Sequence, residues 1–164
     1  MRFASIILDV DSTLTTVEGI AWLATRRGPD VTATVDAMTH DAMTGALPLD
    51  AVYAKRLSLV RPSRLDLFAL ASAYSAGLVP GALDAIGTLR DAGVRIVLVS
   101  GGLRDAILPF AAELGFSAQD VHAVELQFAS DGSYVGFDAA APLACAGGKP
   151  RIARMLGLRG PVLA

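Results

Sequence analysis

Several sequence features are scarce in this chain, and each scarcity excludes a class of protein. The 164 residues include one cysteine, Cys145, so no internal disulfide can form, and no histidine lies at a metal-ligand spacing from it. We expect Cys145 to be a small buried side chain in a protein of a reducing compartment. An excess of one charge sign is also missing, since 14 basic and 16 acidic residues are mixed along the chain. This balance indicates no basic patch that would bind nucleic acid or anionic lipid, so we expect a small-molecule partner.

Long apolar segments that could cross a membrane are missing as well. The longest uncharged stretch, residues 67–83, is interrupted by two serines, two glycines and a proline, so it should not span a bilayer. The apolar run at the start of the chain ends at Asp9, which makes it too short for a secretory signal. The sequence therefore predicts no membrane partner and a cytoplasmic location.

Two nearly continuous apolar runs, residues 4–10 and 94–99, predict strands that are covered on both faces of a parallel sheet. Between them lie several helical segments instead of one crossover helix, and one of these begins with the capping-box pattern Ser63-x-x-Asp66. We therefore predict an α/β fold with a doubly wound, parallel, Rossmann-like sheet. Its core would comprise residues 1–14 and 79–164, and residues 15–78 would form an inserted helical cap domain.

The second half of the chain predicts the rest of the core. A helix ends at Gly93, and another follows the strand 94–99 and ends at Gly115. Residues 121–128 alternate between apolar and polar, and a Ser-Asp-Gly turn leads to residues 134–137, which predicts a hairpin. After a short helix near 149–156, residues 161–164 look like the opening of another buried strand. Because the chain then stops, we expect the C-terminal part of the core to be missing.

Two carboxylates, Asp9 and Asp11, follow the first strand at the edge where open α/β sheets bind their ligands. Side chains two residues apart would point the same way. One could then attack a phosphorus atom while the other exchanges a proton, and a divalent cation would relieve their repulsion. The alternative is that residues 9–13 only shape a turn and cap a helix, because Asp, Ser and Thr favour both. The motif alone leaves these readings open.

Two further features could bind an anion. Ser100-Gly101-Gly102 follows the second strand and would open a helix, where a hydroxyl and free backbone N–H groups can hold a phosphate. The alternative is that these glycines only form a turn between two elements, and this explanation is preferred when the segment is considered by itself. Lys149 follows a double glycine at a predicted helix start, so it could reach the same edge of the sheet.

Taken together and in this order around a helical insertion, these motifs resemble those of the haloacid dehalogenase-like phosphatases. Within that superfamily the whole chain is similar to the phosphoserine phosphatase subfamily. Further segments carry the resemblance: residues 9–14 with Glu18, the Ala-Met-x-Gly pattern at 42–45, and Lys-Arg-Leu-Ser-Leu at 55–59.

The resemblance implies a role for each matching residue at the phosphate. Asp9 would be the nucleophile and a Mg²⁺ ligand, and Asp11 would be the general acid/base and bind Mg²⁺ through its backbone carbonyl. Ser100 would hold the phosphoryl oxygens together with the Gly101 and Gly102 segment. Lys149 would neutralise charge on Asp9 and on the phosphate.

At the other end of the substrate, the resemblance implies that Glu18 binds the ammonium group and Arg56 the carboxylate. Met43 would close over them, and Leu49 would supply apolar cover where the subfamily often has an aromatic residue. Arg56 can also be assessed without the family, because it lies within an apolar helical stripe that includes Tyr53. An arginine there could bind a ligand carboxylate, pair with a structural carboxylate or extend from the core edge to solvent.

The resemblance thus implies a Mg²⁺-dependent hydrolase that converts L-phosphoserine to serine and phosphate, the last step of serine biosynthesis, through an aspartyl-phosphate at Asp9. The subfamily carries a fourth, acidic motif after the strand that begins here at Val162, and this chain ends before it. We therefore expect weak metal binding, little turnover, and an exposed core edge that could favour a homodimer. Two alternatives are phosphoryl transfer to another small alcohol such as homoserine, and a non-catalytic fragment that binds phosphate or an amino acid.

Overall fold

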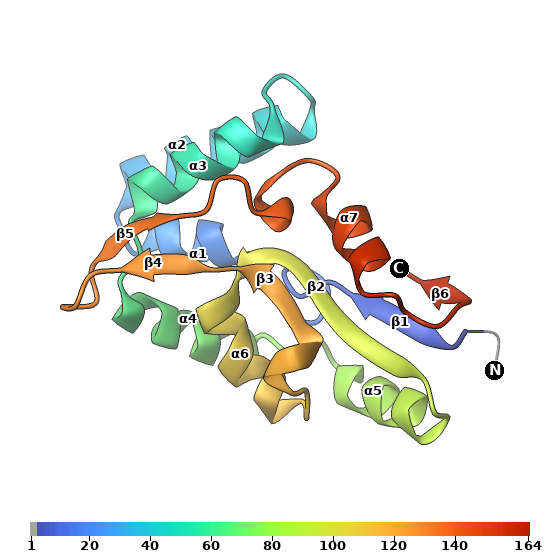
Figure 1. Ribbon diagram of the computed structural model, residues 1–164. Helices are drawn as coiled ribbons and strands as arrows, with labels where there is room; N and C mark the ends of the chain where they lie inside the picture. Colours follow the sequence, from blue (N-terminus) through green and yellow to red (C-terminus); the bar gives the residue numbers. More distant parts are fainter. Residues whose placement is uncertain (1–2) are drawn as a thin grey trace.

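A four-stranded parallel sheet forms the centre of the molecule, with the strand order β3-β2-β1-β6 (Figure 1). The structure is a computed structural model that describes residues 3–164, except for the side chains of residues 43, 49 and 50. In β1, Ile6 lies level with Ile96 of β2 on one side and with Leu163 of β6 on the other. The strands are β1 (Ser5–Leu8), β2 (Arg95–Leu103), β3 (Val121–Val124) and β6 (Val162–Leu163).

Helices cover both faces of this sheet, because alternate side chains of each buried strand point to opposite faces. On one face, Ile6 and Leu98 pack in the main core with residues of α5 (Ala82–Asp91) and α6 (Arg104–Glu113). On the other face, three side chains pack against α7 (Gly148–Met155) and its flanking loops: Ile7, Val97 and Val99. The predicted doubly wound parallel fold is therefore confirmed.

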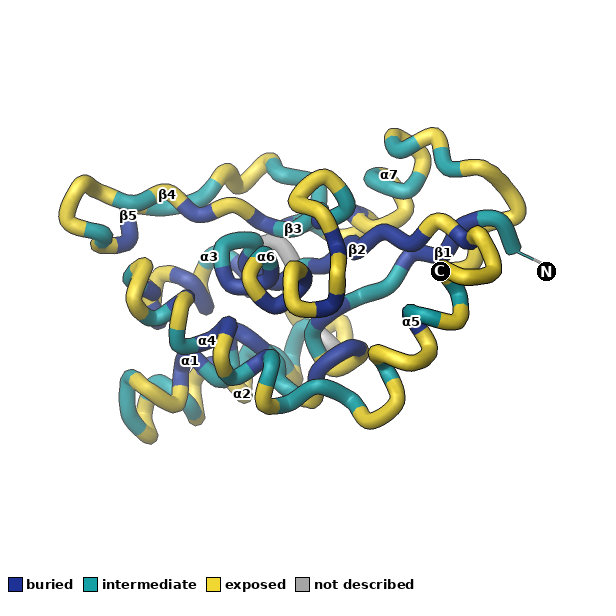
Figure 2. The backbone as a smooth tube through the Cα atoms, turned by 90° about the horizontal axis from the view of Figure 1, so that it is seen from below, coloured by how far each residue is buried: buried dark blue, intermediate teal, exposed yellow. Residues whose placement is uncertain are grey.

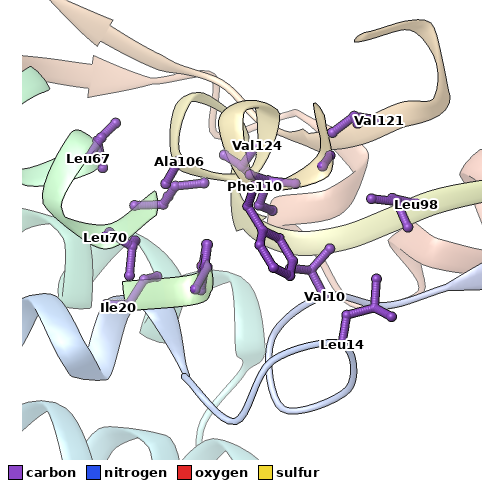
Figure 3. Packing of buried hydrophobic residues seen from close by; sticks show 14 of the residues in the cluster. Val10, Leu14, Ile20, Leu67, Leu70, Leu98, Ala106, Phe110, Val121 and Val124 are labelled. Atoms are coloured by element: carbon purple, nitrogen blue, oxygen red, sulfur yellow. The ribbon is translucent and has the colours of Figure 1, made fainter. Parts of the chain in front are cut away.

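The main core continues from the sheet into the helical insertion, and Figure 3 shows its side chains at this junction. Phe110 of α6 is 1% exposed and lies 5.7 Å, between ring centroids, from Tyr74 of α4 (Arg64–Ala76). Burial follows the same path in Figure 2, where dark blue segments run through the middle of the molecule and yellow segments lie at its outer surface. Contacts of this kind fix the insertion firmly to the sheet.

Four helices lie between β1 and α5, as the sequence predicts: α1 (Gly19–Thr25), α2 (Pro29–Met43), α3 (Leu49–Val60) and α4. The two connecting segments meet, since Thr15 forms an isolated antiparallel bridge with Leu78 and the Val79 N–H donates to the Leu14 carbonyl at 2.9 Å. The division into a core and a cap at 15–78 stays a prediction, and this crossing point is consistent with it. Among the residues described, no helix is both long and apolar enough to cross a membrane.

Three local predictions were wrong. Residues 121–128 do not form one hairpin strand: β3 joins the parallel sheet, and only β4 (Leu126–Phe128) pairs with β5 (Tyr134–Phe137). Gly101 and Gly102 do not open a helix, because β2 continues to Leu103 and α6 begins at Arg104. The strand at the end of the chain is not buried, since Val162 and Leu163 are 39% and 45% exposed on the edge of the sheet.

The turn from α3 to α4 is held by a capping box and an ion pair centred on Asp66. The Ser63 N–H and hydroxyl donate to Asp66 Oδ2 at 2.9 and 2.8 Å, and the Asp66 N–H donates to Ser63 Oγ. Arg27 Nη2 also donates to Asp66 Oδ2, at 2.5 Å. Partial burial alone would raise the pKa of Asp66, but the hydrogen bonds from Arg27 and Ser63 lower it from 3.8 to about 2.

Replacing Asp66 with asparagine is therefore expected to lower the free energy of unfolding by about 1–2 kcal/mol near neutral pH. A lowered pKa in the folded state stabilises the protein above the unfolded value of 3.8, and this contribution is lost as the pH falls through about 2. Denaturant unfolding at several pH values should show the difference between wild type and Asp66→Asn shrinking below pH 4. Asp36→Asn, at an exposed position in α2, is the matched control and should show no such trend. A difference independent of pH would contradict this account.

Candidate functional site

A cavity of about 380 Å³ opens where the carboxyl ends of β1 and β2 meet the helical insertion and the start of α7. All the predicted site residues whose side chains the structure describes line this one cavity: Asp9, Asp11, Glu18, Arg56, Ser100, Gly101, Gly102 and Lys149. The side chains of Met43 and Leu49 lie outside the described residues. The position agrees with the general rule that open α/β sheets bind ligands beyond the carboxyl ends of their strands.

The backbone after β1 winds around one buried residue, and this places Asp9 in the cavity. The Val10 carbonyl accepts N–H groups from Thr13, Leu14 and Thr15, which tightens the turn. The Val10 N–H donates to Asp9 Oδ1 at 2.8 Å, and the Lys149 ammonium donates to Asp9 Oδ2. With its side chain 30% exposed, Asp9 is a fixed carboxylate that a ligand can reach.

Asp11 occupies a different environment in the same turn. Its Oδ2 accepts the Gly19 N–H at 3.2 Å, while its Oδ1 is buried without a hydrogen-bond partner. A Cβ atom at Gly102 would lie 3.1 Å from Oδ2 and 3.2 Å from Oδ1, so a side chain there would crowd the carboxyl group. Glycine at that position therefore leaves space for Asp11.

Burial, followed by the negative charge of Glu18, raises the pKa of Asp11 from 3.8 to about 7. The Tyr74 hydroxyl and the Gly19 N–H act in the opposite direction but are outweighed. A group with this pKa can both donate and accept a proton near neutral pH, which is the property required of a general acid/base.

Ser100 lies on β2, lines the same cavity as Asp9 and Asp11, and is 1% exposed. Its Oγ accepts the Gly102 N–H at 3.1 Å, so the hydroxyl proton remains for donation to another acceptor. A donor of this kind at the wall of the cavity suits a phosphoryl oxygen.

Two glycines explain how Lys149 reaches Asp9. Gly147 adopts a left-handed conformation with φ of 71° at the N-cap of α7. A Cβ atom at Gly148 would lie 1.8 Å from the Pro142 carbonyl oxygen, so no side chain fits there. The double glycine thus lets α7 begin in close contact with the loop that contains Pro142, and Lys149 follows in the first turn of the helix.

Arg56 and Glu18 face the cavity from the helical insertion. The Arg56 side chain is 9% exposed on α3, within the predicted apolar stripe, and its Nη2 lies 3.6 Å from Glu18 Oε1. Neither Nε nor Nη2 of Arg56 has a hydrogen-bond partner. Glu18 is the N-cap residue of α1, yet its side chain forms no capping bond. A buried guanidinium whose N–H groups at Nε and Nη2 have no hydrogen-bond acceptor is costly unless a ligand supplies one.

Tyr53 and Cys145 are among the cavity-lining residues that the sequence did not reveal. Tyr53 was predicted only as part of the apolar stripe, but its hydroxyl donates to the Gly101 carbonyl at 2.7 Å. Cys145 was expected to be buried, whereas it is partly exposed at the cavity wall, because the loop before α7 forms that wall. The position of Tyr53 one helical turn before Arg56 was the only signal available for it.

Asp9 and Asp11 are the candidate residues for a magnesium site at the cavity. Among the side chains that the structure describes, no group of three or more Asp, Glu, His or Cys residues is arranged to hold a metal ion. Asp9 nevertheless offers a partly exposed carboxylate at the cavity, and Asp11, two residues further along the same turn, adds a backbone carbonyl oxygen. Mg²⁺ prefers oxygen ligands and commonly keeps several waters with one or two carboxylates, so these residues fit it.

Several known proteins are similar to this chain in sequence or in structure. The sequence profile of the haloacid dehalogenase-like hydrolases matches residues 6–161. Mouse phosphoserine phosphatase is 38% identical over 152 residues, which cover 93% of this chain and 67% of the mouse protein. The chain thus spans about two thirds of the length of this relative.

Solved structures agree. A phosphoserine phosphohydrolase-like protein from Francisella tularensis superimposes with a TM-score of 0.85 at 26% identity, covering 99% of this chain and 76% of that one. A phospho-aspartyl intermediate analogue of phosphoserine phosphatase superimposes with a TM-score of 0.71 at 26% identity, covering 97% and 75%. With the profile match over nearly its whole length, the chain belongs to the haloacid dehalogenase-like hydrolases, and it is similar to phosphoserine phosphatases of that family.

Proposed function

We propose that this phosphatase-type hydrolase cleaves L-phosphoserine to serine and inorganic phosphate. The observation that carries the proposal is Arg56, a buried guanidinium whose Nε and Nη2 have no hydrogen-bond partner, in the same cavity as the Asp9–Lys149 pair. A guanidinium binds a carboxylate with two parallel hydrogen bonds. A substrate with a phosphate at one end and a carboxylate at the other would therefore satisfy both ends of the cavity.

Glu18 adds selectivity for an amino acid. Its carboxylate lies 3.6 Å from Arg56 Nη2 and is 43% exposed, so it remains available to the substrate ammonium. In the complex, Arg56 would pair with the substrate carboxylate and Glu18 with the ammonium, which matches both charges of the serine end. A phosphomonoester without these groups would gain only the phosphate contacts.

The reaction follows from the positions of the two aspartates. Asp9 attacks the phosphorus atom, the bond from phosphorus to the serine oxygen breaks, and Asp11 gives its proton to that oxygen. Asp11 then takes a proton from a water molecule, which attacks the aspartyl-phosphate and releases phosphate with Asp9 restored. The related phospho-aspartyl intermediate analogue of phosphoserine phosphatase supports such an intermediate at Asp9.

Charge on the phosphoryl group is stabilised by groups already in place. The Lys149 ammonium contacts Asp9, and the Ser100 hydroxyl retains a proton to donate. Asp9 and the Asp11 backbone carbonyl would hold Mg²⁺, which when bound neutralises phosphoryl charge. The predicted homodimer and cytoplasmic location stay predictions.

Phosphate release from L-phosphoserine in the presence of MgCl₂ tests the proposal. We expect slow release, with serine as the second product, and less release from phosphoethanolamine, which lacks the carboxylate. Adding homoserine should not divert phosphate to a new ester. Binding of L-phosphoserine without release of phosphate would support a non-catalytic protein. The absence of both binding and release would refute the assignment.

A further inference from the structure

Tyr53 joins the helical insertion to the phosphate-binding end of β2. It lies on α3, one helical turn before Arg56, and is 6% exposed at the wall of the cavity. Its hydroxyl donates to the Gly101 carbonyl at 2.7 Å. A buried tyrosine hydroxyl normally requires a partner, and here that partner belongs to the segment next to Ser100.

The peptide between Gly101 and Gly102 is consequently held at both ends. Its carbonyl oxygen accepts from Tyr53, and its N–H donates to Ser100 Oγ at 3.1 Å. No side chain at either glycine helps to fix this peptide, so within β2 these two hydrogen bonds contribute to its orientation. The Ser100 hydroxyl oxygen has one lone pair occupied by Gly102, which directs its proton elsewhere.

We propose that Tyr53 is a positioning residue for phosphate binding: its hydroxyl orients the Gly101–Gly102 peptide, and this peptide orients the Ser100 hydroxyl toward the phosphate. The inference rests on the proposed phosphate chemistry of the cavity. It also links the two ends of the substrate site, because the helix that carries Arg56 is attached through Tyr53 to the segment that carries Ser100.

The variant Tyr53→Phe removes the hydroxyl and keeps the ring, which packs edge-on against Phe137 at 5.5 Å between centroids. We expect the dissociation constant of inorganic phosphate, measured by calorimetry with MgCl₂ present, to rise about five- to twenty-fold. Ser100→Ala should cause a similar loss. In the double variant Tyr53→Phe/Ser100→Ala, the dissociation constant of phosphate should be less than about twofold higher than in Ser100→Ala alone, because the hydroxyl that Tyr53 orients is gone.

Tyr134→Phe is the matched control, because Tyr134 is a buried tyrosine of β5 outside the cavity lining. It should change phosphate affinity less than about twofold. The amide resonances of Gly101 and Gly102 provide a second readout, and they should shift in Tyr53→Phe but not in Tyr134→Phe. A general loss of structure would move many resonances and lower the melting temperature instead.

Several outcomes would overturn the inference: unchanged phosphate affinity in Tyr53→Phe, fully additive losses in the double variant, or no phosphate binding by the wild type. If coupling between Tyr53 and Ser100 is observed but L-phosphoserine is not hydrolysed, only the proposed substrate is wrong. If L-phosphoserine is hydrolysed without such coupling, only the role of Tyr53 is wrong.

Discussion

Replacing Asp9 with asparagine is expected to lower phosphate release from L-phosphoserine by about 1,000-fold or more. The amide is nearly the same size and can still accept the Val10 N–H through its oxygen, so the turn after β1 should persist. It cannot form an aspartyl-phosphate, and it offers no negative charge to the Lys149 ammonium. The measurement is the rate of phosphate release at saturating substrate and MgCl₂.

Asp84→Asn is the control for this experiment, because it makes the same chemical change on the exposed first turn of α5. Its rate should equal that of the wild type. If Asp9→Asn retained more than a tenth of the wild-type rate, another residue would have to be the nucleophile. Circular dichroism and thermal unfolding of both variants separate a loss of chemistry from a loss of fold.

The two aspartates occupy different environments in one turn, which supports the two proposed roles. Asp9 is partly exposed and bound to a lysine, which suits the proposed nucleophile. Asp11 is two residues away, but burial and the charge of Glu18 raise its pKa to about 7. Separate environments for paired carboxylates are the general means of assigning acid and nucleophile roles. The sequence motif predicts that both acids face one site, but it does not show which is buried.

Strong local signals predicted most of the fold. The apolar runs of β1 and β2 and the capping box at Ser63 depend on neighbouring residues, and the structure contains all three. The split at Glu125 could not be predicted, because the alternation of residues 121–128 is the same whether a strand pairs in the sheet or in a hairpin. Only the partner strands distinguish the two, and these lie elsewhere in the chain.

The same limit applies to the site. The order of the motifs predicted that Asp9, Ser100 and Lys149 would meet, because the fold brings the carboxyl ends of β1 and β2 together and α7 begins beside them. The contact between the Tyr53 hydroxyl and Gly101 could not be predicted, since a helical stripe indicates burial but not what a hydroxyl at its end will contact. The roles of the residues in the cavity stay predictions until variants are tested.

Replacing Arg56 with alanine is expected to lower kcat/KM for L-phosphoserine by about 100-fold or more, because a buried carboxylate–guanidinium pair would be lost. For phosphoethanolamine the change should be less than about fivefold, since this ester has no carboxylate to bind. The kcat/KM of Arg56→Lys for L-phosphoserine should lie between those of wild type and Arg56→Ala. An ammonium group is a point charge, and it lacks the planar pair of N–H donors that a guanidinium presents to a carboxylate.

Lys55→Ala supplies the matched control, because it removes one positive charge from the neighbouring, exposed position of α3. It should leave both esters nearly unaffected, which separates a specific contact from a general change in the field of the cavity. Equal losses for L-phosphoserine and phosphoethanolamine in Arg56→Ala would contradict the substrate assignment. Arg56 would then stabilise the insertion through Glu18, and the melting temperature should fall together with both rates. A loss confined to L-phosphoserine with an unchanged melting temperature is the result that a carboxylate site requires.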